Sequence, residues 1–165
     1  MPSKLYLSFG SGSFIEKIME RDSNIRAASG AGEALLFIET DGKSPFQSGH
    51  GYDVLEARGV FGDEGDIVYW SVPAERNGGD LFVHHVMSDP KLIGAETDSF
   101  QALRIGRVLK GTDLIVLIQF RDSADASSYL KSVERLTAEQ YAEEAGAALS
   151  AGPIIKRYHL IHKTN

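Results

Sequence analysis

Residues 100–120 read FQALRIGRVLKGTDLIVLIQF and carry the clearest pattern in the chain. Phe100 to Leu109 and Leu114 to Phe120 are rich in the aliphatic and β-branched residues that favour strands. Between them, Lys110-Gly111-Thr112-Asp113 has the length and composition of a hairpin connection. The segment therefore predicts two antiparallel strands joined by a short turn.

The residues before this hairpin predict a strand and then a helix. Ile67 to Val72 is a strand-like run that Pro73 closes. After a glycine-containing break, apolar residues recur at helical spacing until Asp89-Pro90, where the proline disfavours further helix. The residues of this apolar face are Leu81, Phe82, His85 and Val86.

The residues after the hairpin predict a second helix and a last strand. Asp122 is placed to cap a helix whose apolar face contains Tyr129, Val133 and Leu136. Ile154 to His162 then alternates as a final strand. The order from Ile67 onward is β-α-β-β-α-β, which is the order of a ferredoxin-like module.

The residues before Gly62 repeat part of that order. Lys4 to Phe9 alternates as a strand, and Ser13-Phe14-Ile15-Glu16 fits a capping box that would begin a helix. Ile25 to Ser29 and Ala34 to Ile38 are short strand-like runs, whereas Tyr52 to Phe61 permits either strand or helix. This half is therefore β-α-β-β with an uncertain fourth strand.

A polar, glycine-rich stretch, Gly62-Asp63-Glu64-Gly65-Asp66, separates the two patterns. We therefore expect an N-terminal β-α-β-β half over residues 1–62 and a ferredoxin-like half over residues 66–165. The expected fold class is α+β, with two sheets packed together in one chain.

Composition excludes several classes of protein. The 165 residues hold 42% apolar and 24% charged side chains, which is typical of a globular chain and not of a disordered one. The net charge of −6 disfavours binding to a nucleic-acid backbone. There is no cysteine, which removes disulfides, thiolate nucleophiles and cysteine-based metal sites.

The sequence gives no sign of export or membrane insertion. Residues 1–10 hold no long apolar run, and the longest aliphatic run, Leu114 to Ile118, is far shorter than the roughly 20 residues of a membrane span. We expect a soluble cytoplasmic protein.

Several segments match a known family in the same order along the chain. They are Lys4 to Gly10, Phe37 to Gly42, Tyr52 to Val54, Phe100 to Ser132 and Arg157-Tyr158. Together they resemble the two-domain antibiotic-biosynthesis-monooxygenase-type proteins of Gram-positive bacteria. That family includes the signal-transduction protein TRAP and a related heme-degrading monooxygenase. The resemblance covers nearly the whole chain.

The resemblance implies a dimeric-α/β-barrel architecture in which one chain forms a whole barrel from two ferredoxin-like halves. It also implies a heme site, which in the heme-degrading members uses an Asn on the first strand of the second half, a Trp at the end of its third strand and a His on the next helix. Here the Asn position falls at Trp70 or Ser71 and the Trp position at Phe120. No histidine occurs between Val86 and Tyr158. The side chains nearest to the ligand position are Glu139, Gln140 and Tyr141, and Tyr141 is a candidate because tyrosine can ligate ferric heme.

Other constellations do not predict a site. His84 and His85 are adjacent on a helix and diverge, His159 and His162 fall on opposite faces of a strand, and His50 lies in a glycine-flanked loop. No Ser/His/Asp arrangement is legible, and no serine lies in a Gly-x-Ser-x-Gly elbow.

Two interpretations follow. In the first, the barrel binds a small planar ligand, heme or another aromatic, near Trp70, Ser71, Phe120 and Tyr141. As an enzyme it would then be a heme-degrading or a cofactor-independent monooxygenase. In the second it is a non-catalytic signalling or stress-response protein of the TRAP kind. Either would be a monomer or a homodimer without nucleic-acid partners.

Overall fold

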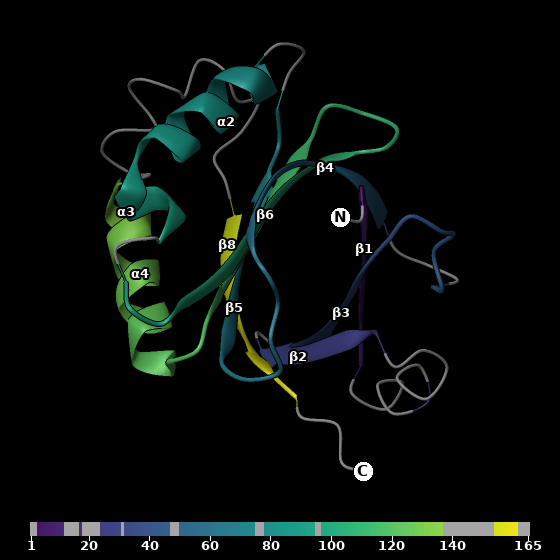
Figure 1. Ribbon diagram of the computed structural model, residues 1–165, viewed down its shortest axis with the longest axis horizontal. Helices are drawn as coiled ribbons and strands as arrows, with labels where there is room; N and C mark the ends of the chain where they lie inside the picture. Colours follow the sequence, from purple (N-terminus) through teal and green to yellow (C-terminus); the bar gives the residue numbers. More distant parts are fainter. Residues whose placement is uncertain are drawn as a thin grey trace.

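Eight antiparallel strands close into one barrel, with helices on its outer face (Figure 1). The computed structural model describes residues 3–11, 17, 24–30, 32–46, 50–74, 78–94, 97–136 and 154–161. The strands are β1 (Lys4–Gly10), β2 (Arg26–Gly30), β3 (Glu33–Thr40), β4 (His50–Gly59), β5 (Asp66–Val72), β6 (Phe100–Val108), β7 (Leu114–Phe120) and β8 (Ile154–Leu160). The helices are α2 (Gly78–Ser88), α3 (Pro90–Ile93) and α4 (Ser123–Leu136).

The strand order around the barrel is β1-β3-β2-β8-β5-β7-β6-β4. It contains the same arrangement twice. In each half the fourth strand pairs with the first, the first with the third, and the third with the second: β4-β1-β3-β2 and β8-β5-β7-β6. Two seams, β2 with β8 and β4 with β6, join the halves. The α+β barrel of two ferredoxin-like halves that the resemblance implied is confirmed. The expectation of two packed sheets is wrong, because the strands of both halves pair into one closed sheet.

Most predicted elements are confirmed. The hairpin strands β6 and β7 lie where the pattern put them, and Val108 N donates to Asp113 O across the turn at 2.9 Å. Asp122 caps α4, since its Oδ1 accepts from Ala124 N at 2.7 Å. The capping box at residues 13–16 lies outside the described residues.

The ambiguous segment after Tyr52 is strand β4, and a bulge explains why its pattern was mixed. The pairing of β4 with β6 shifts register between Val54 and Glu56. A bulge adds one residue and breaks the two-residue alternation. Leu55 therefore packs on the outer side with the helices, while Val54 packs inside the barrel. His50, expected in a loop, is the first residue of this strand.

Alternation along the strands sends side chains to the barrel interior and to two outer clusters, one on each half; the outer cluster of the first half contains Tyr6, Ile25, Ala27, Ala34, Leu36 and Ile38. Inward residues such as Leu7, Phe37 and Tyr158 fill the barrel interior. Outward residues of the second half, such as Val116 and Phe120, pack under α2 and α4. We call this second cluster the helix–sheet layer; its buried members are Val68, Trp70, Val72, Ala74, Phe82, Val86, Ile93, Leu103, Ile105, Leu114, Val116, Ile118, Phe120, Ala126, Tyr129 and Val133.

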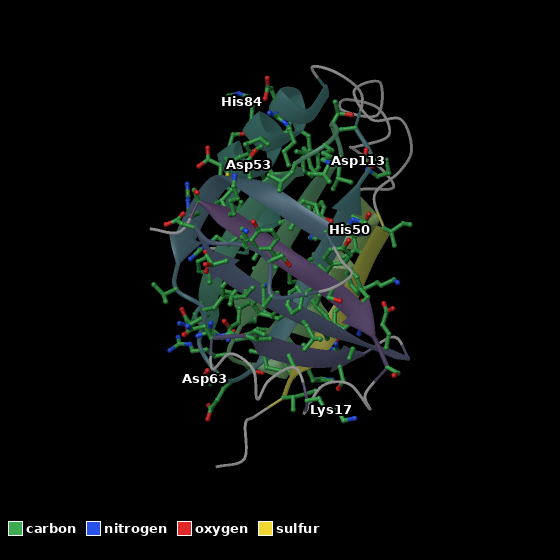
Figure 2. The ribbon with its side chains drawn as sticks, turned by 90° about the vertical axis from the view of Figure 1, so that its right-hand side faces the viewer. Lys17, His50, Asp53, Asp63, His84 and Asp113 are labelled. Atoms are coloured by element: carbon green, nitrogen blue, oxygen red, sulfur yellow. The ribbon has the colours of Figure 1, made fainter. Side chains whose placement is uncertain are left out.

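The segment between the halves closes one end of the barrel. Asp63 in this segment lies at the opposite end from Asp113 of the hairpin (Figure 2). Phe61 is buried in the interior, and Gln119 accepts from Gly62 N and donates to the Gly62 and Glu64 carbonyls. The stretch that the sequence marks as a boundary is thus pinned to the barrel.

A buried ion pair crosses the interior between the halves. Arg104 on β6 is 2% exposed, and its Nε donates to Glu39 Oε2 on β3 at 2.7 Å. Its Nη1 donates to the carbonyls of Arg58 and Leu103, and its guanidinium lies 5.1 Å from the centre of the Phe61 ring. These contacts satisfy the buried charge and fix β3, β4 and β6 relative to one another.

Within the described part of the chain, no helix combines the length and apolarity needed to cross a membrane.

Replacing Arg104 tests the cross-barrel pair. Arg104→Ala leaves Glu39 without its partner in the interior, so we expect a loss of about 3–5 kcal/mol in the free energy of unfolding, measured by urea denaturation. Arg107→Ala is the matched control on the same strand, because Arg107 pairs with the exposed Asp80. It should cost less than about 1 kcal/mol. Equal losses would contradict the role given to Arg104.

Candidate functional site

Trp70 lies at the centre of the helix–sheet layer. It is fully buried on β5, and its ring meets Phe82 of α2 edge to face with the centroids 6.1 Å apart. Its indole Nε1 is buried without a hydrogen-bond partner. Burying a donor without a partner costs about 1–3 kcal/mol of folding free energy. The packing contacts of the Trp70 ring do not remove this penalty.

Phe120 lies in the same layer at the end of β7. It is fully buried, and its ring centroid is 5.1 Å from that of Tyr129 on α4. Gly94 follows α3 with φ of 73°, and a Cβ there would lie 2.6 Å from Phe120 Cζ. Glycine is therefore required for α3 to lie against this ring.

The four candidate pocket residues do not all converge. Trp70 and Phe120 share the helix–sheet layer, whereas Ser71 points the other way, on the face of β5 that Ile67 and Tyr69 present to the barrel interior. The division arises because adjacent residues of a strand point to opposite faces. Tyr141 lies outside the described residues.

The described layer does not fit heme. Its buried members are aliphatic or aromatic, none is a histidine, and Trp70 and Phe120 are fully covered by their neighbours. Heme iron needs an axial nitrogen, sulfur or phenolate ligand. Among the described members of the layer, Tyr129 is the one residue with a phenol, and it packs against Phe120.

The two histidines of α2 lie next to each other on the helix. His84 is exposed and His85 half-buried, and their ring centroids are 6.4 Å apart. The described residues contain no group of three or more metal-ligating side chains.

The barrel interior holds a polar cluster around Glu33. Tyr158 OH donates to Glu33 Oε1 at 2.7 Å, and Lys156 Nζ lies 3.3 Å from the same oxygen. Burial raises the pKa of Tyr158, and the hydrogen bond to Glu33 raises it further. Burial likewise raises the pKa of Tyr52 and Tyr69. These phenols stay protonated and supply no base.

Asp66 is a buried carboxylate that the sequence pattern did not single out. It is 1% exposed at the start of β5, and its Oδ1 accepts from Ser123 Oγ at 3.0 Å and lies 2.5 Å from His159 Nδ1. Arg157 Nε lies 3.7 Å from its Oδ2. In the sequence Asp66 looks like the last residue of a polar linker, so its burial becomes visible only once β8 and α4 are in place.

No family model matches the chain. Several solved structures with the same fold match it over most of their length. A major regulator of staphylococcal pathogenesis is 20% identical, with 96% of this chain and 99% of that one covered and a TM-score of 0.79. The heme-degrading enzyme of Listeria monocytogenes is 14% identical over 94% and 98% of the two chains, with a TM-score of 0.67. An anthrone oxidase-like protein is 16% identical over 98% and 92%, with a TM-score of 0.69.

These likenesses confirm the barrel architecture that the sequence resemblance implied. They extend over almost the full length of each chain, so the two-half barrel is the shared unit.

The unsatisfied indole gives a stability prediction. Trp70→Phe removes the unsatisfied N–H, which stabilises the fold, and removes some apolar contacts, which destabilises it. Because these two effects offset, the free energy of unfolding should change by no more than about 1 kcal/mol. Phe82→Ala, which only empties the same layer, should cost about 3–5 kcal/mol. Circular dichroism in urea measures both. If Trp70→Phe lowers the free energy of unfolding as much as Phe82→Ala does, then the unsatisfied indole N–H does not destabilise the fold.

The interior phenols give a pH prediction. Because their pKa values are raised in the folded protein, the stability they support is present below the ordinary tyrosine pKa of about 10 and falls as the pH rises beyond it. Absorbance of phenolate in an alkaline titration should show Tyr52, Tyr69 and Tyr158 ionising only as the protein unfolds. Tyr158→Phe should make the fall in stability shallower. Reversible ionisation of all six tyrosines near pH 10 without unfolding would contradict this.

Proposed function

We propose that this chain is a barrel protein of the antibiotic-biosynthesis-monooxygenase type, with halves 1–62 and 66–165, that binds a small planar aromatic ligand carrying a carbonyl. The binding site is the helix–sheet layer beneath α2 and α4. The observation that carries the proposal is the buried, unpartnered Nε1 of Trp70 in otherwise apolar surroundings.

A ligand of this class matches the layer in two respects. Its flat apolar body replaces contacts among aromatic side chains, here Phe82, Phe120 and Tyr129. Its carbonyl oxygen accepts the hydrogen bond that Trp70 lacks, which removes the penalty of the buried donor. Because Trp70 is fully buried, the ligand enters by displacing α2 and α3 from the sheet.

The likeness to an anthrone oxidase-like protein supports a ligand of about three fused rings. The hypothesis that the layer binds heme has less support, because the described layer supplies no imidazole. We therefore propose binding of an uncharged aromatic ketone and not of an iron porphyrin.

A non-catalytic regulatory role is the second candidate. The complete packing around Trp70 and Phe120 favours it, as does the likeness to the staphylococcal regulator. On this interpretation the layer is a structural core that takes up no ligand.

A matched pair of ligands tests the proposal. Anthrone and 9,10-dihydroanthracene have the same three rings, but only anthrone has the carbonyl. Trp70 is the single tryptophan, so its emission reports on this layer alone. We expect saturable quenching by anthrone, with roughly 3- to 10-fold tighter binding than dihydroanthracene because one hydrogen bond is gained.

Variants separate the carbonyl effect from simple apolar uptake. In Trp70→Phe, with binding followed by calorimetry, the preference for anthrone should vanish, whereas Tyr158→Phe, in the barrel interior, should keep it. Hemin should give no saturable Soret shift. If neither tricyclic compound binds saturably, the ligand proposal fails and the regulatory candidate stands.

A further inference from the structure

Three chemically complementary side chains lie in one row across the seam between the halves. In the antiparallel register, Ser29 of β2 is directly opposite His159 of β8, and His159 is directly opposite Asp66 of β5. The row is therefore Ser29–His159–Asp66 on three neighbouring strands, and it exists only when β2 and β8 pair.

All three side chains point away from the barrel interior. Their neighbours in the chain, Ala28, Tyr158 and Ile67, belong to the interior cluster. Successive residues of a strand point to opposite faces, so Ser29, His159 and Asp66 share the outer face. Directly opposite residues on one face have their Cβ atoms about 4.5–5.5 Å apart.

Asp66 holds the His159 ring in one orientation. The Asp66 carboxylate is buried, and His159 Nδ1 lies 2.5 Å from its Oδ1. Ser123 Oγ donates a hydrogen bond to the Asp66 carboxylate. The positively charged Arg157 guanidinium lies near the same carboxylate. A neutral imidazole with its proton on Nδ1, facing the carboxylate, carries its basic lone pair on Nε2.

The His159 side chain is accessible and lies directly opposite Ser29 in the register of β2 and β8. The His159 side chain is 56% exposed although its Nδ1 meets a buried partner, so the rest of the ring faces solvent. Ser29 is exposed on β2. The two side chains share no hydrogen bond in the structure as it stands; such bonds are often long before substrate binds.

We propose that Ser29, His159 and Asp66 form an acyl-transfer site for small carboxylic esters, separate from the helix–sheet layer. Ser29 Oγ attacks the ester carbonyl carbon while its proton passes to His159 Nε2. The C–O bond to the leaving alcohol breaks, and the alcohol takes that proton. Water then attacks the acyl-serine with His159 again accepting the proton, which releases the acid and restores Ser29. Asp66 is the positioning residue that keeps the imidazole oriented.

Covalent labelling tests the nucleophile directly. We expect diisopropyl fluorophosphate to add one diisopropylphosphoryl group per chain, located on Ser29 by peptide mass spectrometry. Ser29→Ala should abolish the label, and His159→Gln should slow labelling roughly 100-fold, the usual contribution of a general base. Ser128→Ala, an exposed serine on α4, is the matched control and should label like the parent.

A turnover assay and a fold check complete the test. Hydrolysis of p-nitrophenyl acetate should fall to the uncatalysed rate in Ser29→Ala, whose exposed position leaves folding intact by circular dichroism. Asp66→Asn, if its melting shows a native fold, should lower kcat and leave KM nearly unchanged. Absence of label on Ser29, a label on another serine, or undiminished hydrolysis by Ser29→Ala would each overturn the proposal.

Discussion

Closure of the barrel is the constraint on which the other features depend. Four strands of each half pair within the half, and the remaining edges pair across the seams β2–β8 and β4–β6. In a closed barrel every strand has one inward and one outward face, so alternate residues serve different cores. The cross-barrel pair Arg104–Glu39 and the pinned segment around Phe61 then hold the two halves in one register.

That division sets the chemistry of each face. On β5, the even positions carry Asp66 to the outer row and Trp70 to the helix–sheet layer, while Tyr69 joins phenols that remain protonated in the interior. The apolar layer is the site proposed for an uncharged aromatic molecule, and the row that begins at the buried Asp66 holds the groups proposed for acid–base chemistry. One strand thus contributes residues to both proposed sites.

Short-range signals were readable from the sequence, and long-range contacts were not. The hairpin of β6 and β7 and the Asp122 cap depend on residues within a few positions of each other, so periodicity and turn chemistry predicted them. The β4 bulge disturbs that periodicity and hid the strand. Alternation groups Trp70 with Val68 and Val72, but its outward face and its unpartnered nitrogen become visible only once the barrel is closed and α2 lies against it. Asp66 and His159 are 93 residues apart, and no local pattern links them.

The indole N–H of Trp70 gives the most direct test of the central claim, because the chain has one tryptophan and hence one indole proton resonance. A ¹H–¹⁵N spectrum recorded without and with saturating anthrone follows that proton. We expect slow exchange with solvent in the free protein and a downfield shift when the carbonyl accepts the hydrogen bond. A resonance that exchanges rapidly, or that does not move at saturation, would contradict a ligand-binding role for this layer.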